Sequence, residues 1–311
     1  MKRFWPLLLL ILAGCGSGDV TIQVPFVRLF YVGSGTGKIL SATSADGVNF
    51  TEESGTRFEK TGARHPDLFE PVSNQFVLFT TKENRLFKAT ADSMNSTFTE
   101  ETTFDWDKGG NSSTHAITAT GQDESGKTTT TIVTFHCADG IIKRSNYSTS
   151  EGSLSVNARA LVNSHGSGVI CDPTVIKKED GTFLMFYRWA PSETSTDAAE
   201  QKIYAAESSD GLDYTAGVAK KTEGSNFKTV ATNVVRDQAS APSAVKTNSS
   251  KVYLYVQDGT GSSSSGLIVG ISKDQGENFS FQSVAITGLS TAKAQDPHAV
   301  QLATESEEVV P

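Results

Sequence analysis

Short apolar segments separated by polar turns run along most of the chain. One recurring pattern is a Ser-x-Asp-type turn that contains Gly and ends in an aromatic residue. In such a turn the Asp accepts backbone hydrogen bonds, the Gly supplies a positive φ, and the aromatic residue anchors the next strand. The clearest copies lie at 44–50, 209–214 and 272–279, with weaker copies at 91–98 and 148–154. Apolar runs typical of strands precede them, for example at 39–42, 86–89, 203–206 and 267–270.

A second recurring pattern is an opening segment in which a Pro follows one polar or small residue and precedes an apolar run. Its copies lie at 65–69, 172–176, 241–245 and 296–300, and 113–117 has the same character without the Pro. Apolar strands follow the first four openers in chain order, at 76–79, 131–135, 183–187 and 252–255. Opener, second strand, third strand, turn and fourth strand together describe a four-stranded antiparallel unit.

The five openers predict an all-β fold, a five-bladed β-propeller over residues 26–303 with four-stranded antiparallel blades. The last opener has almost no chain after it, and the first strand, at 28–32, has no opener before it. We therefore expect the N-terminal strands to complete the blade whose innermost strand is C-terminal, which closes the ring without a free sheet edge. A β-sandwich would explain alternating strands but not five matched openers. The polar stretches at 123–130, 190–201 and 258–266 are predicted surface loops, and 304–311 is an acidic tail.

The composition of the chain limits the classes of binding partner that we expect. The 311 residues carry a formal net charge of -8, which argues against a nucleic-acid surface. Ser, Thr and Gly are abundant, and no long stretch has apolar residues at helical spacing.

The N-terminus has the order of a targeting segment. A basic start at 1–3 precedes an apolar run at 4–12 that is too short to span a bilayer comfortably. The sequence Leu-Ala-Gly-Cys at 12–15 then resembles the bacterial lipobox. This resemblance implies a signal peptide at 1–14, lipid modification of Cys15, a linker up to residue 25, and export to the cell envelope, with Gly16 favouring the outer membrane. The alternative is an ordinary secretory signal with a chance cysteine.

Two further cysteines, Cys137 and Cys171, lie in apolar strand-like segments. In an oxidising compartment they could pair, but two buried free thiols would fit equally well.

Polar residues gather where the innermost strands of the propeller are expected. Residues two apart on a strand point the same way, so the residues before and after each Pro position are expected to face the axis. The first set is His65, Ser113, Asp172, Ala241 and Asp296, and the second is Asp67, His115, Thr174, Ser243 and His298. We expect a polar axial pocket in which His65, His115, Thr174, Ser243 and His298 bind substrate. The alternative is a water-filled channel whose polar groups satisfy one another.

A metal site built from His115, His298 and an Asp is conceivable. Nothing in the spacing demands one, so we expect neither a metal nor another cofactor.

The openers resemble those of the five-bladed glycoside hydrolases of the arabinanase, levansucrase and invertase superfamily, especially family 43. Asp172-Pro173-Thr174-Val175 matches the Asp-Pro-x-Val segment that carries a pKa-tuning Asp. The segment at 65–68 is similar to an Ala-Pro-Asp-Val segment, and Asp296 fits the position of the general base. The resemblance implies a carbohydrate substrate, with Asp172, Asp296 and Asp67 as the candidate catalytic acids, and a Glu as general acid.

The chain departs from this pattern at the general acid. Ser240-Ala241-Pro242 stands where the family has Glu-Gly-Pro or Glu-Ala-Pro, and a serine cannot protonate a leaving oxygen at neutral pH. Asp237 and Glu70 are alternatives that lie off the motif. Whether the chain is an enzyme therefore stays open. It is either a glycosidase-like propeller with an impaired site or a non-catalytic envelope lipoprotein that binds a glycan or a protein.

Overall fold

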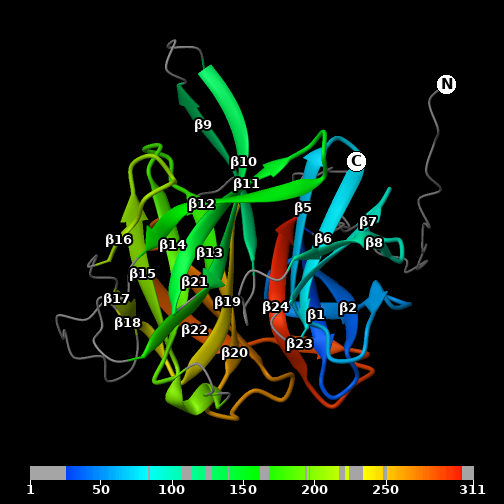
Figure 1. Cartoon of the computed structure of the whole chain (residues 1–311). Helices are drawn as coiled ribbons and strands as arrows, with labels where there is room; N and C mark the ends of the chain where they lie inside the picture. Colours follow the sequence, from blue (N-terminus) through cyan, green and yellow to red (C-terminus); the bar gives the residue numbers. More distant parts are fainter. Residues whose placement is uncertain are drawn as a thin grey trace, which may run out of the picture.

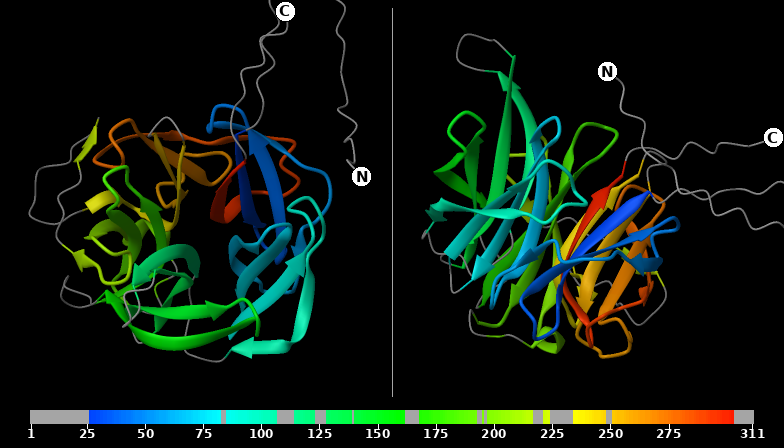
Figure 2. Two further views of the ribbon diagram at one scale, coloured as in Figure 1. Left: turned by 90° about the horizontal axis from the view of Figure 1, so that it is seen from above. Right: turned by 90° about the vertical axis from the view of Figure 1, so that its right-hand side faces the viewer.

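The computed structural model describes residues 26–82, 85–106, 114–122, 128–138, 140–161, 168–192, 195, 197–216, 221–223, 234–247 and 251–302. Five sheets stand as blades around a central axis, and Figure 2 shows the ring from above and from the side. The expected signal peptide, Cys15 with its linker, and the acidic tail lie outside the described residues.

The blades are numbered in the order in which their innermost strands follow one another around the ring. Blade I contains β24 (Ala294–Gln301), β1 (Val27–Gly33), β2 (Lys38–Ser44), β3 (Asn49–Glu52), β4 (Phe58–Glu59) and β23 (Ala285–Thr287). Blade II contains β5 (Arg64–Val72), β6 (Gln75–Lys82), β7 (Arg85–Ala91) and β8 (Thr99–Trp106). Blade III contains β9 (His115–Gln122), β10 (Thr128–Ala138), β11 (Ile141–Ser148) and β12 (Ser153–Leu161). Blade IV contains β13 (Val169–Lys177), β14 (Phe183–Ala190), β15 (Lys202–Ser208), β16 (Thr215–Ala216) and β18 (Val234–Asp237). Blade V contains β19 (Ala239–Lys246), β20 (Val252–Asp258), β21 (Leu267–Ser272), β22 (Asn278–Ser283) and β17 (Lys221–Glu223).

Blade I closes the ring with strands from both ends of the described chain. β1 pairs with β2 on one side and with β24 on the other, so that Val27 lies opposite Gln301 and Gly33 opposite Ala294. The predicted five-bladed propeller and its closure are therefore confirmed. The extra outer strands of blades I, IV and V were not predicted.

The innermost strands form a continuous ring, because β24 contacts β5, and the contacts continue through β9, β13 and β19 back to β24. Each of these strands begins at the lower side of Figure 1 and ends at the upper side, where the β9–β10 hairpin projects beyond the ring. We call the two ends of the axis the lower mouth, where the innermost strands begin, and the upper mouth, where they end.

The hydrophobic core is divided into five wedges, one between each pair of neighbouring blades. Apolar residues of blade I pack against blade V, for example Phe50 with Tyr255, and Phe135 of blade III packs with Tyr214 of blade IV. The remaining three wedges join blades IV and V, I and II, and II and III. These wedges hold each pair of neighbouring blades together around the axis.

The predicted Asp turns have the expected geometry. Asp46 Oδ1 accepts hydrogen bonds from the backbone amides of Val48 and Asn49, and Ser44 Oγ donates to the same carboxylate. Asp210 and Asp274 repeat the arrangement in blades IV and V.

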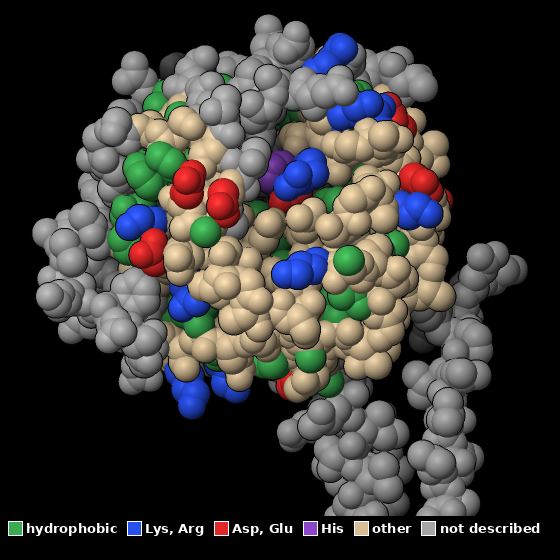
Figure 3. Space-filling view, turned by 90° about the horizontal axis from the view of Figure 1, so that it is seen from below, with side chains coloured by type: hydrophobic (Ala, Val, Ile, Leu, Met, Phe, Trp, Pro, Cys, Tyr) green, Lys and Arg blue, Asp and Glu red, His purple; other side chains and the backbone are tan. Residues whose placement is uncertain are grey.

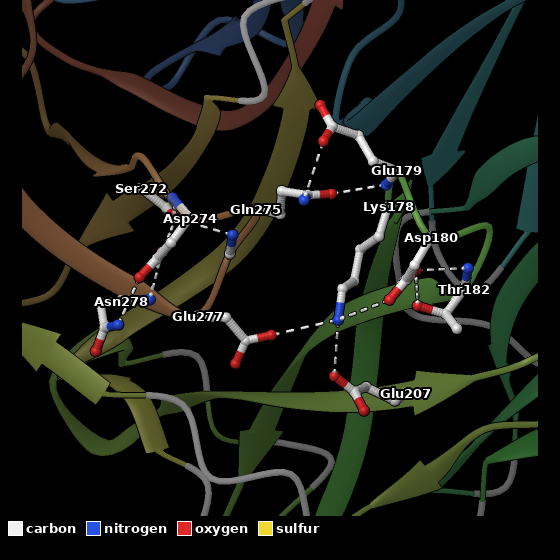
Figure 4. A network of polar contacts seen from close by, with 11 residues as sticks. Lys178, Glu179, Asp180, Thr182, Glu207, Ser272, Asp274, Gln275, Glu277 and Asn278 are labelled. Atoms are coloured by element: carbon white, nitrogen blue, oxygen red, sulfur yellow. Dashed lines mark hydrogen bonds and ion pairs between the residues drawn. The ribbon is translucent and has the colours of Figure 1, made fainter.

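The turn of blade V also joins a polar network with blade IV (Figure 4). Lys178 Nζ lies 3.4 Å from a Glu207 carboxylate oxygen, 3.3 Å from one of Glu277 and 3.9 Å from one of Asp180. Gln275 reaches back to Glu179, with the Glu179 amide 2.6 Å from Gln275 Oε1. These contacts tie the outer part of blade V to the end of β13.

Helix is limited to one short 3-10 turn, η1 (Ala198–Glu200), among the described residues. Over the same part of the chain, no helix has the length and apolar character needed to cross a bilayer.

Candidate functional site at the propeller axis

Four of the innermost strands share a bulge at their Pro. The residue before the Pro has a positive φ in each case, 51° at His65, 53° at Asp172, 46° at Ala241 and 47° at Asp296. The pairing register shifts at the same points, for example between Cys171 and Thr174. A non-glycine residue in this region is strained, and such strain is typical of functional sites. The bulge separates the two predicted sets: the residues before each Pro lie at the lower mouth, and those after it lie deeper along the axis.

Asp296 is the centre of a charged group at the lower mouth. The guanidinium of Arg64 binds its carboxylate through Nε, and a second guanidinium nitrogen lies 3.2 Å from Oδ1. His65 donates its backbone amide over 3.4 Å and places Nδ1 3.6 Å from Oδ1. Burial opposes ionisation of Asp296, but the charges of His65 and Arg64 and their hydrogen bonds outweigh it and lower its pKa to about 2. Asp296 is therefore a carboxylate at all ordinary pH values.

Asp172 is held in the same way by a different arginine. Arg188, from the neighbouring strand β14, binds its carboxylate through Nε, and Asp172 is 1% exposed. Asp296 raises the pKa of Arg64 most, and Asp172 raises it further, so the Arg64 guanidinium lies within the field of both carboxylates. Figure 3 views the lower mouth, where a histidine, a basic side chain and an acidic side chain lie together in a central hollow.

A disulfide lies beside Asp172. Cys171, the residue before it, is bonded to Cys137 of β10, with 4.9 Å between their Cα atoms. The sequence was compatible with either a disulfide or two free thiols, and the structure contains the disulfide. The bond fixes the start of β13 to blade III.

The second predicted set forms a belt of side-chain hydrogen bonds that joins each innermost strand to the next. Thr174 Oγ1 accepts from the Ala244 amide over 3.0 Å, and Ser243 Oγ accepts from the Ala299 amide over 2.8 Å. These bonds lead from β13 to β19 and from β19 to β24.

The other three members of the belt complete the ring. His298 Nε2 lies 3.1 Å from the Leu68 amide on β5, and Thr114, next to β9, donates to Asp67 Oδ2 over 2.9 Å. His115 Nε2 lies 3.2 Å from the Val175 carbonyl oxygen on β13. The belt residues are thus bonded mainly to backbone of the neighbouring blade.

The acidic and imidazole members of the belt have strongly shifted pKa values. Burial raises the pKa of Asp67 to about 8, against the opposing effects of Thr114 and the Ala116 amide. Burial lowers the pKa of His115 to about 4, against its bond with Val175. Burial and the neighbouring His115 lower the pKa of His298 to about 3, and its bond with Leu68 opposes the shift. Near neutral pH both rings are uncharged.

The alternative acids are both exposed and have partners of their own. Glu70 is exposed near the upper end of β5, where it accepts a 2.7 Å hydrogen bond from the Asn74 amide. Asp237 is exposed at the end of β18 and forms an ion pair of 3.4 Å with Lys202. Ser240, at the position of the family's general acid, is 8% exposed at the start of β19.

Sequence reasoning missed the two arginines of the lower mouth. Arg188 could have been recognised as a candidate from the sequence, because it is the single charged residue in the apolar strand β14. Arg64 directly precedes an opener, but its partner Asp296 is 232 positions away.

A separate cavity of about 360 Å³ opens at the upper mouth. Its wall is mainly apolar, from Leu68, Ile117, Val175, Val245 and Val300, and the two belt histidines also line it.

The fold resembles those of known carbohydrate-active enzymes. No protein-family model matches the sequence, and no curated protein matches it. Among solved structures, endo-1,5-alpha-L-arabinanase from Thermotoga petrophila RKU-1 has a TM-score of 0.54 at 12% identity, covering 85% of this chain and 73% of the other. Exo-1,5-alpha-L-arabinanase from a bovine ruminal metagenomic library has a TM-score of 0.52 at 14% identity, covering 85% and 95%. Endo-1,4-beta-xylanase from Bacteroides thetaiotaomicron VPI-5482 has 0.50 at 16% identity, covering 85% and 98%. This chain therefore shares the five-bladed β-propeller fold of family 43-like arabinanases and xylanases.

Proposed function

We propose that this protein is an exported, lipid-anchored propeller whose lower mouth binds a carbohydrate, with the glycosidase chemistry of its structural neighbours impaired. The fold supports the ligand class, because enzymes of similar fold act on polysaccharides by name. The sequence order at 1–15 supports the anchor. The lower mouth supplies both hydrogen-bond donors and acceptors, as the hydroxyl groups of a sugar require.

One observation carries the proposal: two buried carboxylates at the lower mouth are each held by an arginine, and a serine stands where the general acid is needed. Glycoside hydrolysis requires one carboxyl group that is protonated and one that is ionised. The low pKa of Asp296 suits a base but not an acid. Asp172 is paired with Arg188, and Ser240 cannot supply the proton.

Asp67 is the one carboxyl among the described residues whose pKa is raised into the range of a general acid. Its group is 1% exposed and faces the belt histidines. We therefore assign Asp172, Asp296 and His65 to the ligand pocket. The belt residues, in contrast, hold the innermost strands in place next to this pocket.

Measurements of saccharide binding and of saccharide hydrolysis distinguish a carbohydrate-binding site from a working glycosidase site. The purified chain is mixed with arabinan, xylan, other neutral polysaccharides and a panel of aryl glycosides. We expect saturable saccharide binding that raises the melting temperature, without release of reducing sugar. Asp296→Asn should lose binding, while Glu70→Gln, which changes an exposed acid away from the mouth, should keep it.

Two outcomes would contradict the proposal. Turnover that Asp172→Asn and Asp296→Asn abolish would show a working hydrolase. Absence of binding to every saccharide would favour the protein-binding alternative. The anchor is tested in a bacterial host, where Cys15→Ser should move the protein from the membrane fraction to the soluble fraction.

A further inference from the structure

Three donor atoms converge on the axis within the belt. Asp67 Oδ1 lies 3.5 Å from His298 Nδ1 and 3.9 Å from His115 Nδ1. Each of the three side chains offers an atom within 4.8 Å of the others. They come from β5, β9 and β24, so three blades meet at this point.

The far side of each group is already fixed by the protein. His115 Nε2 faces the Val175 carbonyl, His298 Nε2 faces the Leu68 backbone, and Asp67 Oδ2 accepts from Thr114. Contacts of this kind orient the histidines and carboxylates of metal sites and set which ring nitrogen is left to bind.

The inward-facing oxygen of Asp67 is not satisfied. Asp67 Oδ1 has no hydrogen-bond partner, although the residue is 1% exposed. Buried polar atoms normally have a partner, so an unpartnered carboxyl oxygen beside two imidazole nitrogens leaves a position for a further bound group.

We propose that Asp67, His115 and His298 bind one divalent transition-metal ion, of which zinc is the representative. Two imidazole nitrogens and one carboxylate oxygen suit zinc, cobalt or nickel, whereas calcium and magnesium prefer oxygen ligands. Bond lengths near 2.0–2.2 Å in a tetrahedral site place donor atoms roughly 3.4 Å apart. The Asp67–His298 distance of 3.5 Å already fits, and His115 needs to approach by about 0.5 Å.

The cavity at the upper mouth gives the ion a route to the site. His115 and His298 both line it, and Lys177 and Lys246 lie on the same wall. Water or a small anion in this cavity supplies the fourth ligand. The site is therefore distinct from the sugar pocket proposed at the lower mouth.

The bound ion would tie the innermost strands of blades I, II and III together at the axis. Its expected role is structural, because ions that bind only the folded chain stabilise it by mass action. This differs from the expectation of no metal drawn from residue spacing, since the spacing along the chain does not reveal that the three groups meet.

Metal binding is measured on untagged protein that has been treated with a chelator and dialysed. We expect calorimetry to give one zinc ion per chain, a higher melting temperature with zinc, and no displacement by excess calcium. Cobalt should give the visible absorption of a tetrahedral site with nitrogen and oxygen ligands. This spectrum of the unmodified chain does not depend on whether any variant folds.

Variants assign the ligands. His115→Gln and Asp67→Asn should each weaken zinc binding at least tenfold, while His136→Gln, a buried histidine outside the cluster, should bind normally. Circular dichroism confirms folding of each variant. No stoichiometric zinc, no tetrahedral cobalt spectrum, displacement by calcium, or equal loss in His136→Gln would each overturn the proposal.

Discussion

Thr174 Oγ1 accepts a 3.0 Å hydrogen bond from the backbone amide of Ala244, and the bond crosses from the innermost strand of blade IV to that of blade V. Both residues are buried, and 70 positions separate them in sequence. The same kind of bond recurs around the axis. The innermost strands of the described residues belong to five separate sheets, so these side-chain hydrogen bonds join one innermost strand to the next.

Replacing Thr174 with Val keeps the shape of the side chain and removes the acceptor. The Ala244 amide then stays buried without a partner, which costs about 1–3 kcal/mol. We expect urea unfolding to show this loss in the free energy of unfolding. Thr174→Ser retains the oxygen and should lose less. Equal stability of Thr174→Val and the unmodified protein would show that the belt does not hold the blades together.

The ion pair of Asp296 predicts a dependence of stability on acid. The pKa of Asp296 falls from 3.8 to about 2 in the folded state, so its contribution to stability is complete above pH 4. The contribution is lost as the pH falls through about 2. Because the Arg64 side chain is 48% exposed, we expect only about 1–2 kcal/mol.

This contribution is measured as the difference in unfolding free energy between the unmodified protein and Asp296→Asn. The difference should be constant from pH 7 to pH 5 and should shrink between pH 4 and pH 2. A difference that does not change with pH would contradict the assigned ion pair.

Gly47 lies in the turn of Asp46, and Gly35 lies in another turn of blade I. The two glycines can be compared to test how tightly the Asp turn packs. Their φ values are 77° and 73°, so Ala is strained to a similar degree at both positions. A Cβ at Gly47 would lie 2.5 Å from the Tyr253 ring of the neighbouring blade, whereas a Cβ at Gly35 would meet nothing within 4 Å.

We expect Gly35→Ala to cost about 1 kcal/mol and Gly47→Ala to cost a further 1–3 kcal/mol from the clash. Thermal and urea unfolding of the two variants give the comparison. If the two losses are equal, the turn does not pack tightly against blade V.

Lys178 predicts a salt-sensitive contact between blades IV and V. Burial lowers the pKa of Lys178, but Glu207, Glu277 and Asp180 outweigh this effect and raise it. Lys178→Met removes the positive charge and leaves these carboxylates near one another (Figure 4). We expect a loss of about 1 kcal/mol at low salt that becomes smaller at high salt.

Lys177→Met is the control, because Lys177 is exposed and lies over the Phe183 ring instead of within the acidic group. Its stability should change little with salt. A loss in Lys178→Met that is independent of salt would indicate lost packing rather than lost charge.

The sequence by itself determined the number of blades and the closure of the ring. Both follow from local patterns: an opener is recognisable within five residues, and a Ser-x-Asp turn within about seven. The candidate residues of the axis were also identified from local sequence, since each lies one position before or after the Pro position of an opener.

Only the tertiary structure decided what these residues do. The bulge separates Asp172 and Asp296 from the belt, and a period-two strand pattern does not contain it. Arg64 meets Asp296, His298 meets Leu68, and Cys137 meets Cys171 across separations of 232, 230 and 34 residues. Such contacts depend on how the wedges between blades bring distant strands together, and no local pattern encodes that distance.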